Sequence, residues 1–192
     1  MKSTSRNLTI KYLLSSVKES EIFWIISFSV LTIVSAQISI PIKPVPFTLQ
    51  TMIVLLAGAF LGAKNGAYSQ LIYIFLGAVG FPVFAQTADG TMGLARLIGP
   101  TGGYLLAFPV AAYFVGILTQ KNQKYLTVVI SMFVAELIVI LFGTLYLYSA
   151  YLHNLVDALK AGAAIFSIWM VIKVFAAASI YFAFAKKQTR LP

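Results

Sequence analysis

Cysteine is absent from this 192-residue chain, and charged residues make up only 10% of it. The lack of cysteine excludes disulfides, thiol nucleophiles and thiolate metal sites. One histidine and five acidic residues make a poor set for the catalytic or metal-binding cluster of an enzyme. The P-loop pattern G-x-x-x-x-G-K-[ST] does not occur either, so we do not expect the chain to hydrolyse ATP itself.

Apolar residues, by contrast, make up 60% of the chain, and its mean hydropathy is +0.91. Soluble domains contain about 45 to 50% apolar residues, so this composition indicates a polytopic membrane protein. We predict an all-α protein with a single integral membrane domain over residues 1–192, of which residues 1–21 form a basic N-terminal arm. Six apolar runs are compatible with transmembrane helices of roughly 17 to 25 residues. These runs lie near residues 22–40, 48–63, 66–84, 102–119, 125–150 and 161–185.

The placement of the basic residues predicts the orientation of these helices. Six spans put both termini on one side of the membrane, together with ten of the 14 lysines and arginines. The opposite side has three, namely Lys43, Arg96 and Lys160. Because positively charged loops stay in the cytoplasm, we predict cytoplasmic termini and a cell-membrane location. Connections 41–47, 85–101 and 153–160 are then extracytoplasmic, and we expect a ligand cavity beneath them.

Polar side chains outside the cytoplasmic loops are concentrated in and next to these outer connections. The second connection is 17 residues long and ends in the elbow Gly-Pro-Thr-Gly-Gly. Loops of that length usually fold back over a binding site or form an interfacial loop, and composition alone favours neither. The glycines of the elbow fit a tight turn as well as a backbone that approaches a ligand. The candidate ligand-binding residues are Thr48, Gln50, Gln86, Arg96, Gly102, Tyr104, Asp157 and Lys160.

Three features carry weaker signals. Asp157 and Lys160 stand three apart at the start of the last apolar run, so they share a helix face and form either a local ion pair or part of a ligand site. His153 has no second histidine or cysteine near it, so no metal site is expected there. The glycines at positions 58, 62 and 66 have helical spacing, which is typical of close helix packing.

Two ionisable residues, Glu136 and Lys173, lie near the middle of the fifth and sixth runs. Counted from the cytoplasmic ends, they are about 16 Å and about 20 Å deep at 1.5 Å per residue. Charges at such depth are costly unless paired, so we expect the two side chains to meet. A structural ion pair is favoured over a proton relay, because a relay normally needs further carboxylates or histidines.

The segment PIKPVPFTLQTMIVLLAGAFLGAKNGAYSQLIYIFLGAVGFPVFA, followed by RLIGPTGGYLLAFPVAAYFVG, closely resembles the BioY family of biotin-specific substrate-binding proteins. These proteins are the S components of energy-coupling factor (ECF) transporters. The resemblance is strong over residues 36–116 and looser elsewhere. The family also has an aspartate and a lysine three apart at the start of the last helix, matching Asp157 and Lys160. Its Pro-Gly before that aspartate is replaced here by Leu155-Val156.

The resemblance implies high-affinity biotin binding and uptake, without enzymatic activity, cofactor, metal or nucleic acid. A carboxylate would accept from the ureido N–H groups, amide and hydroxyl groups would bind the carbonyl, and a cation would bind the carboxylate tail. The implied partners are a transmembrane T component and two ABC-type ATPases. Thr32 and Ala36 have the small-residue spacing of a docking face, although internal packing is at least as good an interpretation. The alternatives are a secondary transporter of a small anionic metabolite and a membrane interaction protein without transport activity.

The basic asymmetry generates a topology prediction. Cysteines introduced at Asp89 and at Lys187 in separate variants are expected to differ in their reaction with an impermeant thiol reagent in intact cells. The cysteine at Asp89 should be labelled from outside, and the cysteine at Lys187 only after the cells are opened. Labelling of Lys187→Cys but not of Asp89→Cys in intact cells would contradict the predicted orientation.

Overall fold

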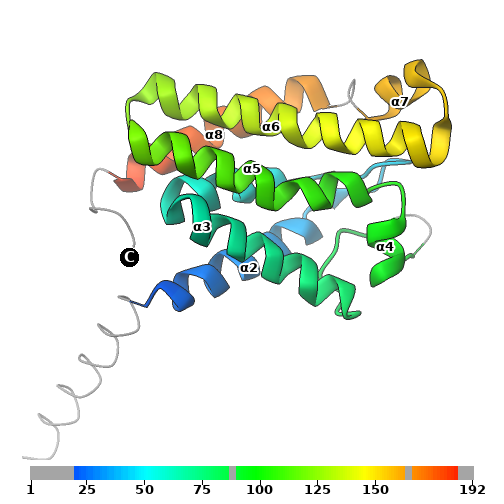
Figure 1. Cartoon of the computed structure of the whole chain (residues 1–192), viewed down its shortest axis with the longest axis horizontal. Helices are drawn as coiled ribbons and strands as arrows, with labels where there is room; N and C mark the ends of the chain where they lie inside the picture. Colours follow the sequence, from blue (N-terminus) through cyan, green and yellow to red (C-terminus); the bar gives the residue numbers. More distant parts are fainter. Residues whose placement is uncertain (1–19, 87–89, 163–165, 186–192) are drawn as a thin grey trace, which may run out of the picture.

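The computed structural model describes residues 20–86, 90–162 and 166–185, and most of these residues are helical, as predicted. Residues 1–19 of the basic arm, together with Asp89 and Lys187, fall outside the described residues. Figure 1 shows long helices lying side by side, with short elements at one end. In chain order the helices are α2 (Glu21–Gln37), α3 (Gln50–Ala78), α4 (Leu94–Ile98), α5 (Gly102–Lys121), α6 (Tyr125–Leu147), α7 (Leu155–Gly162) and α8 (Phe166–Ala185), with a π-helical segment η1 (Tyr148–Leu152) after α6.

Helix α3 is interrupted at Gly62, whose φ of 79° and ψ of −174° are not helical. Only glycine adopts such a conformation readily. The chain folds back at this point, as the closeness of Gly58 and Gly66 shows. A Cβ added to Gly66 would lie 2.9 Å from the Cα of Gly58. In a continuous helix these two residues would be about 12 Å apart. Gly58 and Gly66 therefore allow close packing, as predicted, whereas Gly62 forms the turn between two helical halves.

A short antiparallel hairpin follows α2 and precedes α3. Its strands are β1 (Ser39–Ile40) and β2 (Phe47–Thr48), with Ser39 opposite Thr48 and Ile40 opposite Phe47. The first outer connection is therefore an ordered loop, and its last residues lead directly into the start of α3. This arrangement places the polar residues at the start of α3 next to the loop.

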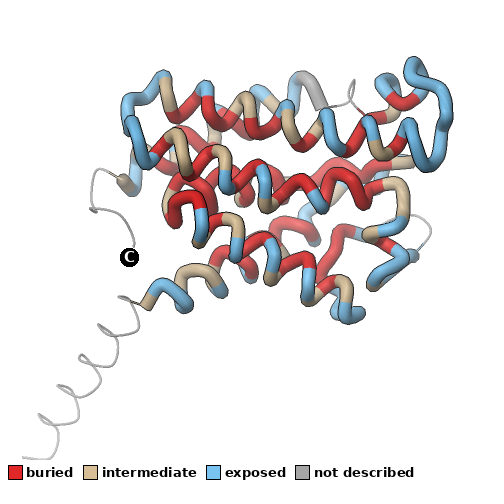
Figure 2. Tube along the Cα trace, in the orientation of Figure 1, coloured by how far each residue is buried: buried red, intermediate tan, exposed pale blue. Residues whose placement is uncertain are grey.

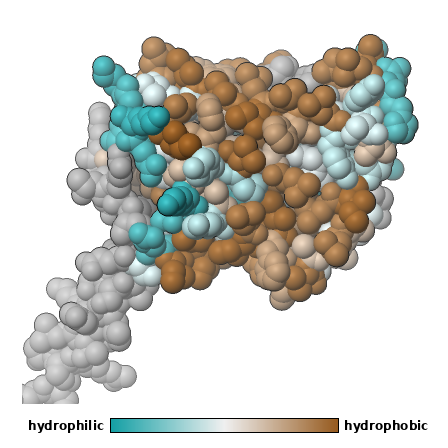
Figure 3. Space-filling view, viewed as in Figure 1, coloured by the Kyte–Doolittle hydropathy of each residue, from teal (hydrophilic) through white to brown (hydrophobic). Residues whose placement is uncertain are grey.

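Within the described residues, three helical segments are long and apolar enough to cross a membrane: Gly102–Lys121, Tyr125–Leu152 and Ile168–Ala185. Helix α2 is apolar but has only 17 residues. The halves of α3 on either side of Gly62 are each shorter than the roughly 17 residues that a straight span needs. Figure 3 shows an apolar surface around the middle of the bundle, with hydrophilic residues gathered towards two ends. This distribution is that of a membrane protein.

The first and last described helices, α2 and α8, show that the two ends of the described chain lie at the same end of the bundle. Helix α2 begins, and α8 ends, at the end of the bundle that also carries the connection between α5 and α6 (Figure 1). The opposite end carries α4, η1 and α7. The outer connections 85–101 and 153–160 therefore share one end of the bundle, in their described parts, as the sequence predicts.

The core forms where α3, α5 and α6 pack against one another, and Figure 2 shows the buried positions facing this interior. Small residues make the close approach possible, because a Cβ on Gly116 of α5 would lie 2.2 Å from the backbone nitrogen of Ala63. Thr32 and Ala36 on α2 are both fully buried, and the Thr32 hydroxyl is 3.2 Å from the amide nitrogen of Gln70, which donates to it. The small-residue pair on α2 is thus used for internal packing and is not exposed for docking.

The two intramembrane charges meet, as predicted. Lys173 Nζ lies 3.1 Å from Glu136 Oε1, and the two side chains are 2% and 1% exposed. Thr51 at the start of α3 donates its hydroxyl to the same Oε1 atom at 2.6 Å, and Lys173 donates to the Thr51 hydroxyl. Lys173 Nζ also lies 5.6 Å from the ring centroid of Phe47, a cation–π contact. One polar cluster thereby ties together β2, α3, α6 and α8.

Because the pair is buried, we expect Glu136→Ala alone to be more destabilising than Glu136→Ala combined with Lys173→Ala. Removing one partner leaves a buried charge and typically costs about 3 to 5 kcal/mol, whereas removing both is often close to neutral. Thermal unfolding of the purified variants in detergent measures the difference. Additive losses in the double variant would show that the two charges do not stabilise each other.

Candidate functional site

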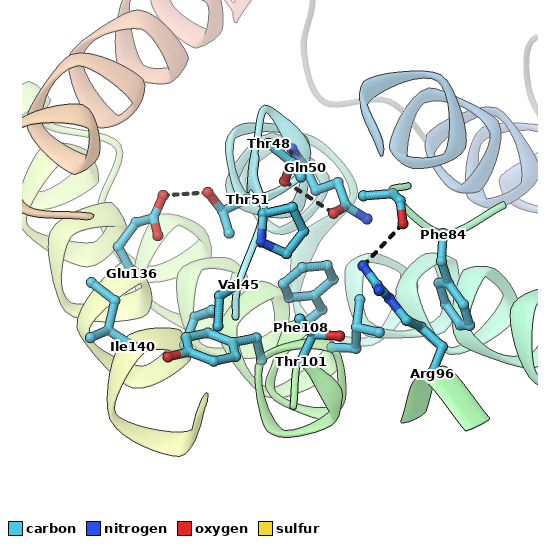
Figure 4. Close-up of a pocket in the computed structure, with 15 residues that line it drawn as sticks. Val45, Thr48, Gln50, Thr51, Phe84, Arg96, Thr101, Phe108, Glu136 and Ile140 are labelled. Carbon is cyan, nitrogen blue, oxygen red and sulfur yellow. Dashed lines mark hydrogen bonds between the residues drawn. The ribbon is translucent and has the colours of Figure 1, made fainter. Parts of the chain in front are cut away.

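A cavity lies among the start of α3, the N-terminal half of α5, the middle of α6 and the first two outer connections, 41–47 and 85–101 (Figure 4). Four of the predicted ligand-binding residues line it. These four are Thr48, Gln50, Arg96 and Tyr104. The remaining lining residues are Val45, Pro46, Thr51, Phe84, Ala85, Thr101, Leu105, Phe108, Glu136, Val139 and Ile140.

A buried cation stands at one side of this cavity. Arg96 on α4 is only 4% exposed, and its Nη2 donates to the carbonyl of Ala85 at 3.0 Å. The neighbouring Thr101 is 6% exposed and lines the cavity, and among the described residues its Oγ1 has no hydrogen-bond partner. A buried polar atom without a partner is costly, so this hydroxyl is suited to bind a ligand. This side of the cavity therefore combines a positive charge with a hydroxyl available for a ligand.

The first turn of α3 contributes an amide that is held in place. The Thr48 hydroxyl donates to Gln50 Oε1 at 3.0 Å, and Gln50 Nε2 donates to the hydroxyl of Tyr73. Tyr73 is fully buried and packs edge-on against Phe84, with ring centroids 5.4 Å apart. Gln50 thus presents a fixed amide to the cavity, because both of its ends are bonded to buried groups.

Glu136 stands across the cavity from Arg96 (Figure 4). Its carboxylate is held by Thr51 and Lys173, as described for the core, and Glu136 itself lines the cavity. Between the two charged sides lie apolar and aromatic walls, formed by the side chains of Val45, Phe84, Leu105, Phe108, Val139 and Ile140. A cavity with apolar walls and a few oriented polar groups is the usual form of a small-molecule site.

The glycine elbow brings α4 and α5 together. A Cβ on Gly102 would lie 1.7 Å from the carbonyl oxygen of Leu97, so this glycine is needed for the close approach of the two helices. Gly102 does not line the cavity described above. The ring of Tyr104 does, but its hydroxyl donates to the carbonyl of Gly162 on α7 at 3.1 Å. The elbow therefore positions Arg96 and Thr101 by packing.

The other three predicted ligand-binding residues lie elsewhere. Gln86 is exposed and lines a neighbouring cavity of about 300 Å³, which shares the side chains of Phe84 and Ala85 with the first. Asp157 and Lys160 are exposed and belong to α7. Neither is among the residues that line the cavity with Arg96.

Three residues that line the cavity, Thr51, Thr101 and Glu136, were not among the predicted ligand-binding residues. Thr101 lies inside the elbow motif, but the prediction considered only the glycines of that motif. Thr51 follows the predicted Gln50 by one residue and has no distinctive pattern. Glu136 was correctly paired with Lys173, but its depth in α6 separated it from the outer connections. Among the described residues no group of three metal-ligating side chains occurs, which includes the surroundings of His153.

Comparison with known proteins identifies relatives of this chain. The sequence profile of the BioY family matches residues 6–190. The "Biotin transporter BioY" of Thermotoga maritima is 39% identical over 153 residues, which are 80% of this chain and 88% of that protein. The "Probable biotin transporter BioY" of Pyrococcus horikoshii is 47% identical over 122 residues, or 64% of this chain and 73% of that protein.

Among solved structures, the crystal structure of the S-component for biotin from an ECF-type ABC transporter has the same fold. It superposes with a TM-score of 0.80 at 25% sequence identity, covering 89% of this chain and 93% of the other. The family profile spans nearly the whole sequence. The chain therefore belongs to the BioY family.

Proposed function

We propose that this protein binds biotin with high affinity and takes it up across the cell membrane as the substrate-specific S component of an ECF-type ABC transporter. The names of its relatives point to transport and not to catalysis. The observation that carries the proposal is the cavity itself, in which a buried arginine faces a set of fixed polar groups across apolar walls.

Biotin has a carboxylate on a flexible tail, an apolar thiophane ring and a neutral ureido group with two N–H donors. A guanidinium binds a carboxylate through two parallel hydrogen bonds, so Arg96 suits the tail, and Thr101 supplies a hydroxyl beside it. The aromatic side chains of Phe84 and Phe108 suit the ring. The Gln50 amide has a second N–H that can donate to the ureido carbonyl, and Thr48 holds this amide in place through its own hydroxyl.

Binding requires the cavity to open further. The space enclosed is about 40 Å³, whereas pockets for ligands of drug size have roughly 300 to 1,000 Å³. Phe84 and Ala85 line both this cavity and the adjoining one beside Gln86, and movement of these two residues is the way we propose for the two spaces to join. The segment that carries Arg96 is fastened at its end, because the hydroxyls of Tyr146 and Tyr151 both donate to the carbonyl of Ile98.

The remaining predictions on topology and partners belong to the same proposal. Six spans, with the two halves of α3 counted separately, put both termini in the cytoplasm and the cavity on the extracytoplasmic side. The excess of basic residues at one end supports this orientation. A T component and two ABC-type ATPases supply the energy, since the chain has no P-loop. Gln86 and Gly102 stay predicted ligand residues because of their place in and next to the second outer connection, and Asp157 and Lys160 because of the family resemblance.

We expect Arg96→Ala to weaken biotin binding by roughly 30-fold or more, because a charged contact in a desolvated site contributes about 2 to 5 kcal/mol. The same variant should bind a biotin amide, which has no carboxylate, nearly as well as the parent protein does. Radiolabelled biotin and competition with the amide, measured on purified protein without nucleotide, give both affinities.

Lys121→Ala is the matched control, because Lys121 is an exposed cation at the far end of α5. It should leave both affinities within about twofold of the parent. A parent protein that binds no biotin would overturn the proposed function, and equal losses for biotin and its amide in Arg96→Ala would overturn the role of Arg96 as the partner of the tail.

A further inference from the structure

The end of α4 is held by two tyrosine hydroxyls. Ile98 is the last residue of α4, and the carbonyls at the end of a helix have no partner within that helix. The hydroxyl of Tyr146 donates to the Ile98 carbonyl at 2.8 Å, and the hydroxyl of Tyr151 donates to the same oxygen. A carbonyl oxygen has two lone pairs, so both are used. We call these two bonds the tyrosine clasp.

A π-helical turn brings the two tyrosines together. Tyr146 lies in the last turn of α6, and Tyr151 lies in η1, where the N–H of His153 donates to the carbonyl of Tyr148, five residues earlier. In a regular α-helix, side chains five residues apart point about 140° away from each other. With the wider π turn between them, the two rings lie on one side, with centroids 6.2 Å apart. Such turns are rare and occur frequently at functional sites.

Apolar burial contributes little to holding α4 in place. Arg96 is the one buried residue among the five of this helix, and Leu94 and Ile98 are exposed. A short segment with so few buried apolar contacts belongs to the least stable parts of a fold. The polar contacts that retain it include the hydrogen bond from Arg96 to the carbonyl of Ala85 and the tyrosine clasp. The clasp therefore ties the arginine side of the cavity to α6 and η1.

The clasp also stands where the cavity has to open. Ala85 and Arg96 line the cavity and are bonded to each other, so a movement of Ala85 either breaks this bond or carries α4 with it. Breaking the bond takes a partner away from a buried cation, which is costly. Breaking the clasp is cheaper, because its bonds lie at exposed positions where water can replace them. We therefore expect α4 to move together with Ala85 when a ligand enters.

We propose that the tyrosine clasp is the contact that opens for ligand exchange, and that Tyr146 and Tyr151 are positioning residues that hold Arg96 at the cavity and set the rate of exchange. This inference rests on the proposed function, because the ligand concerned is biotin. Neither tyrosine nor Ile98 lines the cavity, so the clasp is the same whether the cavity is empty or filled. Its loss changes the rates of binding and release together and leaves the affinity nearly unchanged.

Tyr146→Phe combined with Tyr151→Phe tests the clasp, because it removes both hydroxyls and keeps both rings. Loss of two neutral hydrogen bonds should raise the association and dissociation rate constants of biotin by roughly 5-fold to 100-fold, with the dissociation constant within about twofold of that of the parent. Radiolabelled biotin, added to the purified protein or displaced from it by unlabelled biotin, gives both rate constants.

Folding of the variants is checked by thermal unfolding in detergent. The single variants Tyr146→Phe and Tyr151→Phe each keep one bond of the clasp, so their rate constants should lie between those of the parent and of the double variant. These single variants carry the comparison if the double variant does not fold.

Opening of the cavity can also be measured without any ligand. The chain has no cysteine, so Thr101→Cys places a single thiol at the buried wall of the cavity. Reaction of this thiol with a thiol reagent requires the cavity to open, and removal of both hydroxyls should accelerate the reaction by a factor similar to that for biotin exchange.

Tyr148→Phe is the matched control for both measurements. Tyr148 is exposed on η1, and its side chain makes no hydrogen bond among the described residues. Its substitution should leave the labelling and exchange rates at the values of the parent.

The outcomes separate the clasp from the proposed function. A parent protein that binds no biotin overturns the proposed function, and the labelling of Thr101→Cys still decides whether the clasp controls the opening. If the parent binds biotin, unchanged exchange rates in the folded double variant overturn the clasp alone, whether or not labelling is faster. A higher dissociation constant with an unchanged association rate would also overturn it, because the hydroxyls would then stabilise only the bound state.

Discussion

The cluster formed by Thr51, Glu136 and Lys173 is the constraint on which the rest of the structure depends. A bilayer interior cannot solvate a carboxylate or an ammonium group, so the helices that carry them must bring the charges together. This requirement fixes α6 against α8, and the hydroxyl of Thr51 adds the start of α3 to the same point. Phe47 closes the cluster on the loop side through its ring.

The cavity is a consequence of this arrangement. The start of α3 carries Gln50 next to Thr51, so the helix turn that completes the charge cluster also brings a fixed amide to the cavity. Arg96 reaches the opposite side because glycines allow α4 and α5 to approach closely. The charge cluster and the cavity therefore share the same short segment of chain, because Thr51 and Glu136 belong to both.

Glycine and small residues do the corresponding work in the apolar part of the bundle. The conformation of Gly62 reverses the chain, and Gly58 and Gly116 let α3 and α5 pack backbone to backbone. Apolar packing between helices is not driven by water within a membrane, so close contact of this kind supplies much of the attraction. The exposed apolar side chains around the outside are then left for the lipid.

The sequence by itself determined the helical membrane class, the meeting of Glu136 with Lys173 and the family, since composition, depth along the helices and the motifs around PVPFTLQT and GPTGG are local or one-dimensional properties. It also indicated Thr48, Gln50, Arg96 and Tyr104, which do line one cavity. The packing of the helices was needed to show that Glu136 and Thr101 line that cavity and that the hydroxyl of Tyr104 is bonded to α7. The physical reason is that a side chain's direction depends on how neighbouring helices rotate and pack, and no spacing within a single helix records that rotation.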